Sequence, residues 1–268
     1  MSTLFIEAFG QLLPGGELID SEEEDLYSVF RARAELMGWS TTSGRRSLLW
    51  EMEEAELTAG TKEARIGFVQ VGLNVGDIEG VEVPPPPTSG FHYVPLGMRQ
   101  RATEPAMVLP AVVQCFDDAL RRFGEVELSG LQVTTLSLDP RTRSPADDLV
   151  SGLNWFNLSS SRRTTALMAF DQELLGNRTE AELVADLRLW NTGSFEFGPA
   201  VAVPEQHAVI ASFESEPVSP ARSGFGVSVT LPEWTASAVA WAIAIVMDRA
   251  RAGAPDVSRF AVRVTRDG

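Results

Sequence analysis

Two pairs of adjacent arginines are the residues of this chain best suited to bind an anion. Arg45 and Arg46 follow one polar segment, and Arg162 and Arg163 follow another. A guanidinium donates paired hydrogen bonds to a carboxylate or a phosphate, and two of them in a polar turn concentrate that positive charge. Each pair is therefore a candidate anion-binding site, Arg45 and Arg46 in one turn and Arg162 and Arg163 in the other.

A second group of candidate residues is acidic and lies near the amino terminus. Residues 1–60 contain twelve Asp and Glu side chains against four arginines, which gives −8 of the total charge of −15. Such a density is typical either of a solvated face or of a surface that steers a basic partner by long-range attraction. The candidate partner-binding residues are Glu22, Glu23, Glu24, Asp25, Glu51, Glu53 and Glu54.

The residue types that usually carry catalysis are scarce. His92 and His207 are the only histidines, and neither has a carboxylate at the spacing of a metal-ligand pair. Cys115 is the single cysteine, which excludes an internal disulfide and a cysteine-ligated zinc site. The sequence contains no phosphate-binding glycine motif and no serine-nucleophile motif. We therefore expect no catalytic residue, no metal and no cofactor. These features favour a non-enzymatic protein over an enzyme.

Charge and hydropathy restrict the partners and the compartment. A net charge of −15 and a pI near 4.6 disfavour binding to nucleic acid or to an anionic membrane surface. The apolar segment 234–247 is shorter than the roughly 20 residues that span a bilayer, and the first residues lack the features of a secretion signal. We expect a cytoplasmic protein with a basic protein as its partner. The sequence is also consistent with a homodimer.

Ordered landmarks in the two halves of the chain predict that one α+β unit occurs twice. The same short patterns recur in the same order, and a repeat of this length fits the usual size of a domain. The paired landmarks are residues 8–11 and 169–172, the capping-box spacings Ser21 to Glu24 and Thr179 to Glu182, and residues 124–133 and 253–262.

The expected fold is therefore α+β, a tandem duplication of a β-α-β-β-β-α-β unit. Each unit is expected to form a mostly antiparallel sheet with helices packed on one face. The first unit spans residues 1–139, residues 140–153 connect the two, and the second unit spans residues 154–268. The expected strands are 4–11, 47–57, 64–73, 90–96, 128–138, 164–170, 194–203, 207–214, 224–230 and 257–265, and the expected helices are 22–37, 112–123, 180–190 and 233–252.

The last of these helices has apolar residues nearly all round. Helices of this kind are normally buried. We expect Trp241 and Ile245 to face the sheet.

The second half contains a series of three features: segment 189–193, the strand-like segment 224–232 and a following helix that bears Trp234 and Trp241. This series resembles the small α+β immunity proteins of bacterial polymorphic-toxin systems. The resemblance implies an acidic, cytoplasmic, non-enzymatic protein that binds a toxin domain and occludes its active site.

Two functions are consistent with these features. The first is a non-catalytic bacterial binding protein, an immunity-type inhibitor that neutralises a basic toxin domain through the acidic amino-terminal unit. The alternative is an enzyme or a small-molecule-binding protein with a cleft between the two units, in which arginines hold an anionic ligand.

Overall fold

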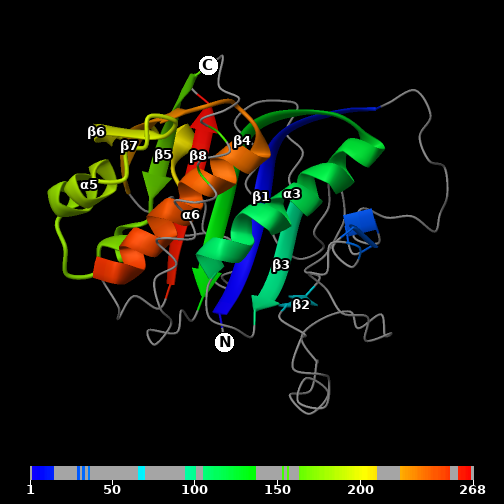
Figure 1. The fold of residues 1–268 in the computed structure, drawn as a ribbon, viewed down its shortest axis with the longest axis horizontal. Helices are drawn as coiled ribbons and strands as arrows, with labels where there is room; N and C mark the ends of the chain where they lie inside the picture. Colours follow the sequence, from blue (N-terminus) through cyan, green and yellow to red (C-terminus); the bar gives the residue numbers. More distant parts are fainter. Residues whose placement is uncertain are drawn as a thin grey trace, which may run out of the picture.

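The computed structural model places strands from both halves of the chain in one sheet of eight strands, in the order β2-β3-β1-β4-β8-β5-β7-β6 (Figure 1). Every neighbouring pair of strands is antiparallel. The strands are β1 (Ser2–Pro14), β2 (Ile66–Val69), β3 (Val94–Gln100), β4 (Gly124–Leu136), β5 (Thr164–Phe170), β6 (Glu196–Ala202), β7 (Phe225–Leu231) and β8 (Arg259–Arg266). The structure describes residues 2–14, 29–30, 32–33, 36, 66–69, 94–100, 105–136, 153, 156, 163–209, 224–253 and 259–266.

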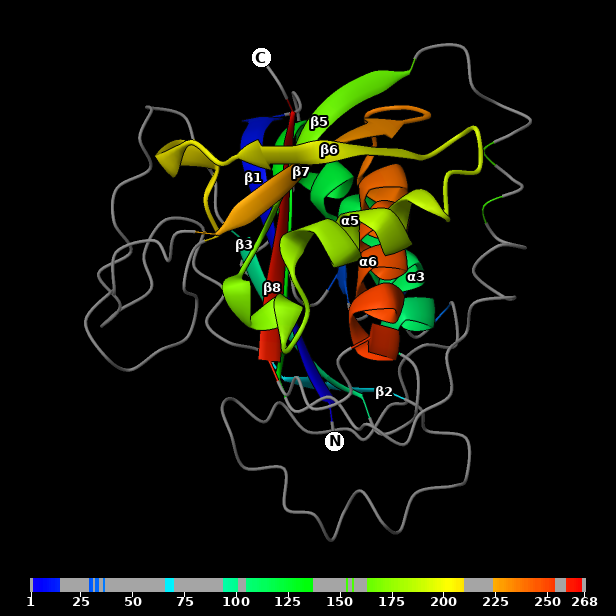
Figure 2. The same ribbon diagram turned by 90° about the vertical axis from the view of Figure 1, so that its left-hand side faces the viewer.

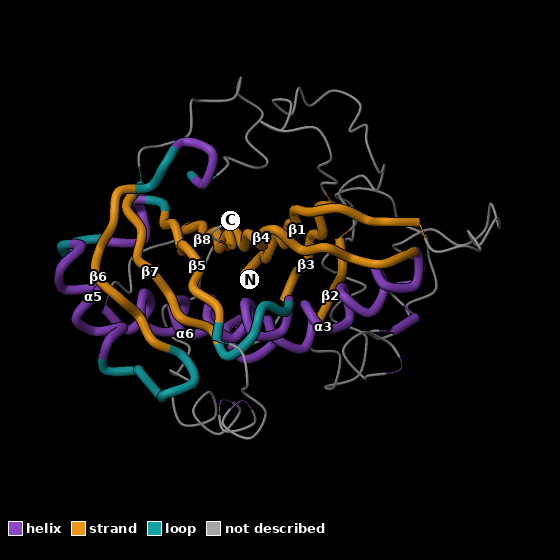
Figure 3. The backbone as a smooth tube through the Cα atoms, turned by 90° about the horizontal axis from the view of Figure 1, so that it is seen from above, coloured by secondary structure: helices purple, strands orange, loops and turns teal. Residues whose placement is uncertain are grey.

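The α-helices α3 (Pro105–Phe123), α5 (Glu180–Arg188) and α6 (Ala236–Gly253) pack on one face of this sheet. The long helices α3 and α6 lie side by side across its middle, and α5 contacts both β6 and α6 (Figures 2 and 3). Two short 3-10 helices complete the described elements, η1 (Gln172–Leu175) and η2 (Glu205–His207). The helix η2 lies on the opposite side of the sheet from α3 and α6 (Figure 3).

The hydrophobic core fills the space between the sheet and these helices. Alternate residues of the central strands point into it, among them Ile6 on β1, Val133 on β4 and Val262 on β8, each fully buried. Period-two alternation of this kind places the intervening residues on the second face. Burial of each such side chain contributes about 1.5 to 3 kcal/mol, so this layer supplies much of the stability of the fold.

The helix α6 is tied to the sheet at its start. The Thr235 hydroxyl accepts a hydrogen bond from the backbone N–H of Ala238 at 3.2 Å, which caps the first turn. The indole N–H of Trp234 donates to the carbonyl of Leu128 on β4 at 2.6 Å. Ile245 is fully buried, as expected, whereas Trp241 is only partly buried and packs at the margin of the core.

The strand β1 keeps its pairing with β4 through a bulge at Phe9 and Gly10. Gly10 has a φ of +151°, a conformation that favours glycine. A Cβ atom at this position would lie 2.1 Å from the carbonyl oxygen of Glu127, so no other residue fits without moving the backbone. The bulge changes the register after Phe9, whose side chain lies on the face opposite the core.

The expectation of two separate sheets was wrong, because β4 and β8 pair along seven residues, from Gly130 opposite Thr265 to Leu136 opposite Arg259. An exposed strand edge carries unpaired backbone groups, and pairing the last strands of the two halves removes two such edges. We call this β4–β8 pair the seam. Of the expected connection at residues 140–153, the structure describes only Leu153, which is buried.

The strand expected at 207–214 does not begin where the sequence predicts it. Pro204 starts a 3-10 turn instead, with the backbone N–H of His207 bonded to the Pro204 carbonyl at 2.9 Å. Residues 208 and 209 follow without strand structure, and the rest of the range lies outside the described residues. The described elements of the second half are therefore β-α-β-β-α-β, one strand fewer than expected.

Candidate functional site

Of the candidate anion-binding and partner-binding residues, the structure describes only Arg163. Its Nη1 atom lies 2.7 Å from the Glu196 carboxylate, and its Nη2 donates to the carbonyl of Gly193. Its guanidinium is thus bound at the start of β5 and β6, away from the seam. The other predicted site residues lie outside the described part of the chain: Glu22, Glu23, Glu24, Asp25, Glu51, Glu53, Glu54, Arg45, Arg46 and Arg162.

The structure instead brings together a row of buried polar side chains across the seam. Glu7 on β1 pairs in register with Gln132 on β4, which pairs in turn with Arg263 on β8. Glu7 and Gln132 are fully buried, and Arg263 is 5% exposed. The amide Nε2 of Gln132 donates to the Glu7 carboxylate. We call these three residues the seam cluster.

Strand alternation explains why the seam cluster lies on the face opposite α3 and α6. The neighbours of Arg263 along β8, Val262 and Val264, are core residues, so the arginine between them points the other way. The segment that contains η2 covers this position from the second face, and the carbonyl of Ala208 accepts a hydrogen bond from Arg263 Nη1 at 2.8 Å. A small apolar cluster beside it, Ala169, Val209 and Ala261, holds the same segment in place.

The guanidinium of Arg263 is in an unusual environment for a charged group. Its carbon lies 4.4 Å from the centre of the Phe9 ring, a cation–π contact. Burial lowers the pKa of Arg263 to about 10, and the negative charge of Glu7 opposes that shift. The side chain therefore stays positively charged at neutral pH. Among the described residues, no atom accepts a hydrogen bond from its Nε.

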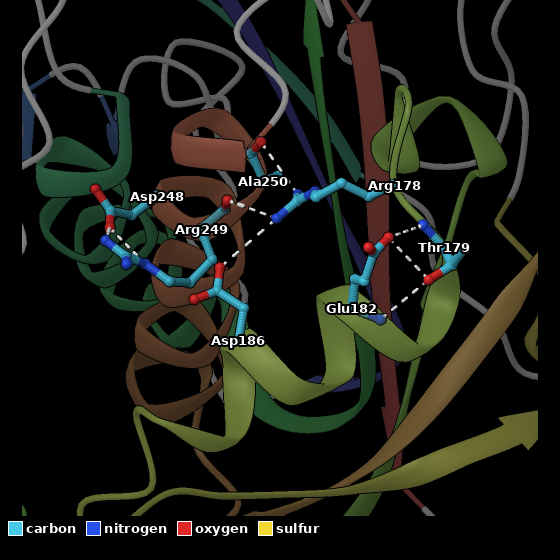
Figure 4. Close-up of polar contacts among 7 residues, drawn as sticks. All are labelled: Arg178, Thr179, Glu182, Asp186, Asp248, Arg249 and Ala250. Atoms are coloured by element: carbon cyan, nitrogen blue, oxygen red, sulfur yellow. Dashed lines mark hydrogen bonds and ion pairs between the residues drawn. The ribbon is translucent and has the colours of Figure 1, made fainter.

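A second polar network joins α5 to α6 (Figure 4). Arg178 donates to the carbonyls of Arg249 and Ala250 in the last turns of α6, at 3.3 and 3.2 Å, and lies 3.6 Å from the carboxylate of Asp186. Arg249 pairs with the buried Asp248. A cation near a helix carboxyl terminus complements the helix dipole, and the network thereby fixes α5 against α6. Its geometry is that of a structural contact.

The remaining reactive groups do not form a catalytic arrangement. Burial in α3 raises the pKa of the Cys115 thiol to about 11, so the sulfur is protonated and a poor nucleophile at neutral pH. Within the described ranges, no three His, Cys, Asp or Glu side chains lie close enough together to hold a metal ion. The helices of these ranges include none that is long and apolar enough to cross a membrane.

Sequence reasoning missed the seam cluster although a signal for it was present. Glu7 is the single charged residue of β1, and Arg263 lies between the apolar residues Val262 and Val264 on β8. Charged residues are almost never fully buried unless they are paired, so each was a candidate for a buried polar contact. Comparison with known proteins gives no further guide, because no family model, no curated protein and no solved structure matches this chain.

Proposed function

We propose that this chain is a non-catalytic, cytoplasmic binding protein that neutralises a basic partner, in the manner of an immunity-type inhibitor occluding a toxin domain. The observation that carries the proposal is the distribution of charge. The described residues contain 12 of the 22 basic and 14 of the 37 acidic side chains, a net charge of −2. The remaining residues contain 10 basic and 23 acidic side chains, a net charge of −13.

This distribution separates two roles within the molecule. The sheet and its helices form a nearly neutral frame whose arginines face carboxylates at 2.7 Å in the pairs Arg33–Asp118 and Arg121–Asp117. The acidic excess belongs to the other residues of the chain. Concentrated negative charge raises the rate of encounter with a basic surface and disfavours acidic partners. A nearly neutral folded frame with the acidic excess elsewhere in the chain suits a protein that works by binding.

We also propose that the frame arose by tandem duplication. The strand order reads β2-β3-β1-β4 from one edge and β6-β7-β5-β8 from the other, so each strand has a counterpart four strands later in the chain. The sequence match of residues 124–133 to 253–262 agrees with this order, because Val133 lies opposite Val262 in the seam. The match of Phe9 to Phe170 does not agree, because Phe170 lies in the core and Phe9 on the other face.

The binding proposal is tested with the quadruple variant Glu22→Gln, Glu23→Gln, Glu24→Gln, Asp25→Asn and basic toxin domains of polymorphic-toxin systems. Failure of the unmodified protein to bind any of them would contradict the immunity-type role. We expect the variant to lower the association rate more than it raises the dissociation rate. Association of the unmodified protein should slow as salt rises from about 0.1 M to about 1 M, because the Debye length falls from about 10 Å to about 3 Å. Stopped-flow kinetics measures both rates.

The matched control changes the charge of the frame by the same amount, through exposed carboxylates of the described elements. It carries Glu125→Gln, Glu127→Gln, Glu180→Gln and Glu205→Gln. We expect this control to associate at nearly the unmodified rate. Equal slowing by both quadruple variants would show that only net charge matters, and would remove the acidic segment at residues 22–25 from the proposal.

A further inference from the structure

A helical segment near the amino terminus carries an apolar side chain that the rest of the protein leaves uncovered. Residues 29, 30, 32, 33 and 36 are helical. Leu36 and Leu189, each 82% exposed, are the exposed large hydrophobic residues of the part of the chain that the structure describes. Single leucines on a protein surface are common, so the surroundings of each one decide whether it marks a contact.

The helical segment is anchored to the core within two turns of Leu36. Phe30 is buried in the core, Val29 packs against it, and the Nε atom of Arg33 lies 2.7 Å from the carboxylate of Asp118 on α3. Leu36 follows Val29 by seven residues and Arg33 by three, spacings that place these three residues on one face of a helix. The face that packs on the protein at Val29 is therefore uncovered at Leu36. A side chain on an anchored helix is positioned in advance, which lowers the entropic cost of a contact.

Negative charge is concentrated in the sequence that leads into Leu36. Residues 17–36 contain seven Asp and Glu side chains and two arginines, a net charge of −5. The charge of one of these arginines, Arg33, is offset by its ion pair with Asp118. A partner that contacts Leu36 has to accommodate this negative charge, and a surface rich in lysine and arginine does so best.

The charges beside Leu189 are of the opposite sign. Leu189 caps α5, which lies at the other end of the sheet (Figure 1). It directly follows the exposed Arg188 and precedes Trp190, whose ring centre lies 4.4 Å from the guanidinium carbon of Arg249. A basic surface is disfavoured beside these two arginines. Of the two exposed leucines, Leu36 is therefore the one whose surroundings suit a basic partner.

We propose that Leu36 is the apolar anchor of the contact with the basic partner, and that it enters an apolar pocket bordered by lysine and arginine side chains of that partner. This inference rests on the proposed function and adds to it the point of contact and the character of the partner's surface. The acidic residues steer the encounter and act mainly on the association rate. Burial of Leu36 in the complex acts mainly on the dissociation rate.

The test measures the association and dissociation rates of the full chain with basic toxin domains of polymorphic-toxin systems. We expect Leu36→Ala to raise the dissociation rate roughly ten- to thirtyfold and to leave the association rate within about twofold, because the apolar surface that the pocket buries is lost. Leu36→Met keeps a similar apolar volume and should stay within roughly threefold of the unmodified dissociation rate. The matched control Leu189→Ala removes an equally exposed leucine, and both rates should stay within about twofold.

Thermal unfolding separates a contact from a structural role. Because Leu36 is exposed, Leu36→Ala should keep the unmodified Tm, and a lowered Tm would show that the leucine stabilises the chain itself and would overturn the proposal. Three kinetic results also overturn it: an unchanged dissociation rate in Leu36→Ala, an equal rise in Leu189→Ala, or an equal rise in Leu36→Met. Slower association of the quadruple variant at residues 22–25 would then still support the proposed function without this anchor. If none of the toxin domains binds the unmodified protein, both the proposed function and the anchor are rejected.

Discussion

At the scale of single residues, burial decides whether a reactive group can react. Cys115 is the single thiol, and its pKa of about 11 compares with an ordinary value of 9.0. We expect iodoacetamide at pH 8 to alkylate it at least roughly a hundredfold more slowly in the folded than in the urea-unfolded chain, because the thiolate is the nucleophile. Mass spectrometry over time measures both rates. Equal rates would show that the thiol is accessible in the folded protein.

Gln132 is the residue that keeps the buried Glu7 carboxylate hydrogen-bonded from the next strand. Replacing it in Gln132→Met removes this donor while keeping a similar volume, and we expect a loss of about 1 to 3 kcal/mol in the free energy of unfolding. The matched control is Gln114→Met on the exposed face of α3, which should change stability by less than about 0.5 kcal/mol. Urea denaturation measures both. A similar small change in the two variants would mean that Glu7 does not depend on the amide.

The seam cluster also shows what residue-level reasoning could and could not supply. Glu7, the single charge of β1, and Arg263, between Val262 and Val264 on β8, were signals for buried polar contacts that the sequence analysis did not use. Their mutual placement depends on the register of three strands, and 125 residues separate Glu7 from Gln132. No local pattern contains that register. The arginine pairs attracted attention because they are adjacent in sequence, yet the structure shows Arg163 bound to Glu196.

At the scale of elements, a local signal predicted the amino-terminal cap of α5. Thr179 and Glu182 form the expected capping box at the start of α5, in which the Glu182 carboxylate accepts from the Thr179 backbone N–H at 2.7 Å and from its hydroxyl at 2.9 Å. The hydrogen bonds from Thr179 lower the pKa of Glu182. The counterpart at Ser21 and Glu24 lies outside the described residues. Capping boxes are predictable because the whole motif lies within four residues.

The capping box gives a pH-dependent prediction. A carboxyl group whose pKa is lower in the folded state stabilises the fold above its ordinary pKa, and this stabilisation is lost as the pH falls through the lowered value. We expect the Glu182 carboxyl carbon to titrate below the ordinary glutamate range in an NMR experiment. In Thr179→Ala it should titrate higher, though not fully at the ordinary value, because the backbone hydrogen bond is kept. Titration of the unmodified residue at the ordinary value would contradict the capping box.

The burial of α6 followed from its apolar composition, whereas the orientation of its side chains did not. Because apolar residues surround the helix, the sequence could not show which of them faces the sheet. Ile245 is fully buried, so we expect Ile245→Ala to cost about 2 to 5 kcal/mol in the free energy of unfolding. Ser237→Ala, on the partly exposed stripe of the same helix, is the control and should cost less than about 0.5 kcal/mol. Chemical denaturation measures both losses of unfolding free energy. Equal losses in Ile245→Ala and Ser237→Ala would show that Ile245 lies at the surface.

At the scale of the whole molecule, the joining of the two halves was the feature that sequence reasoning could not reach. The alternation of β4 and β8 predicts that each is a strand with one face in the core. It does not say which strand pairs with which, because the unpaired backbone N–H and C=O groups of one strand edge can bond to those of any other edge. The pairing of Val133 with Val262 also brings α3 and α6 together on the same face, so the cores of the two halves become continuous.

This continuity predicts that the two halves unfold as one cooperative unit. The seam is the one place where described strands of the first half hydrogen-bond to described strands of the second, and one hydrophobic cluster includes Ile6 of β1 and Ile245 of α6. In native-state hydrogen exchange, amides that exchange only through global unfolding report the global free energy of unfolding. A variant that destabilises the fold therefore lowers the protection of all these amides by the same free energy. We therefore expect Ile245→Ala, a change in the second half, to lower the protection of the slowest β1 amides by the same free energy as those of β5. Gln114→Met should leave both sets nearly unchanged. If the halves were independent domains, Ile245→Ala would weaken β5 alone, and unaltered protection of β1 would reject a single cooperative core.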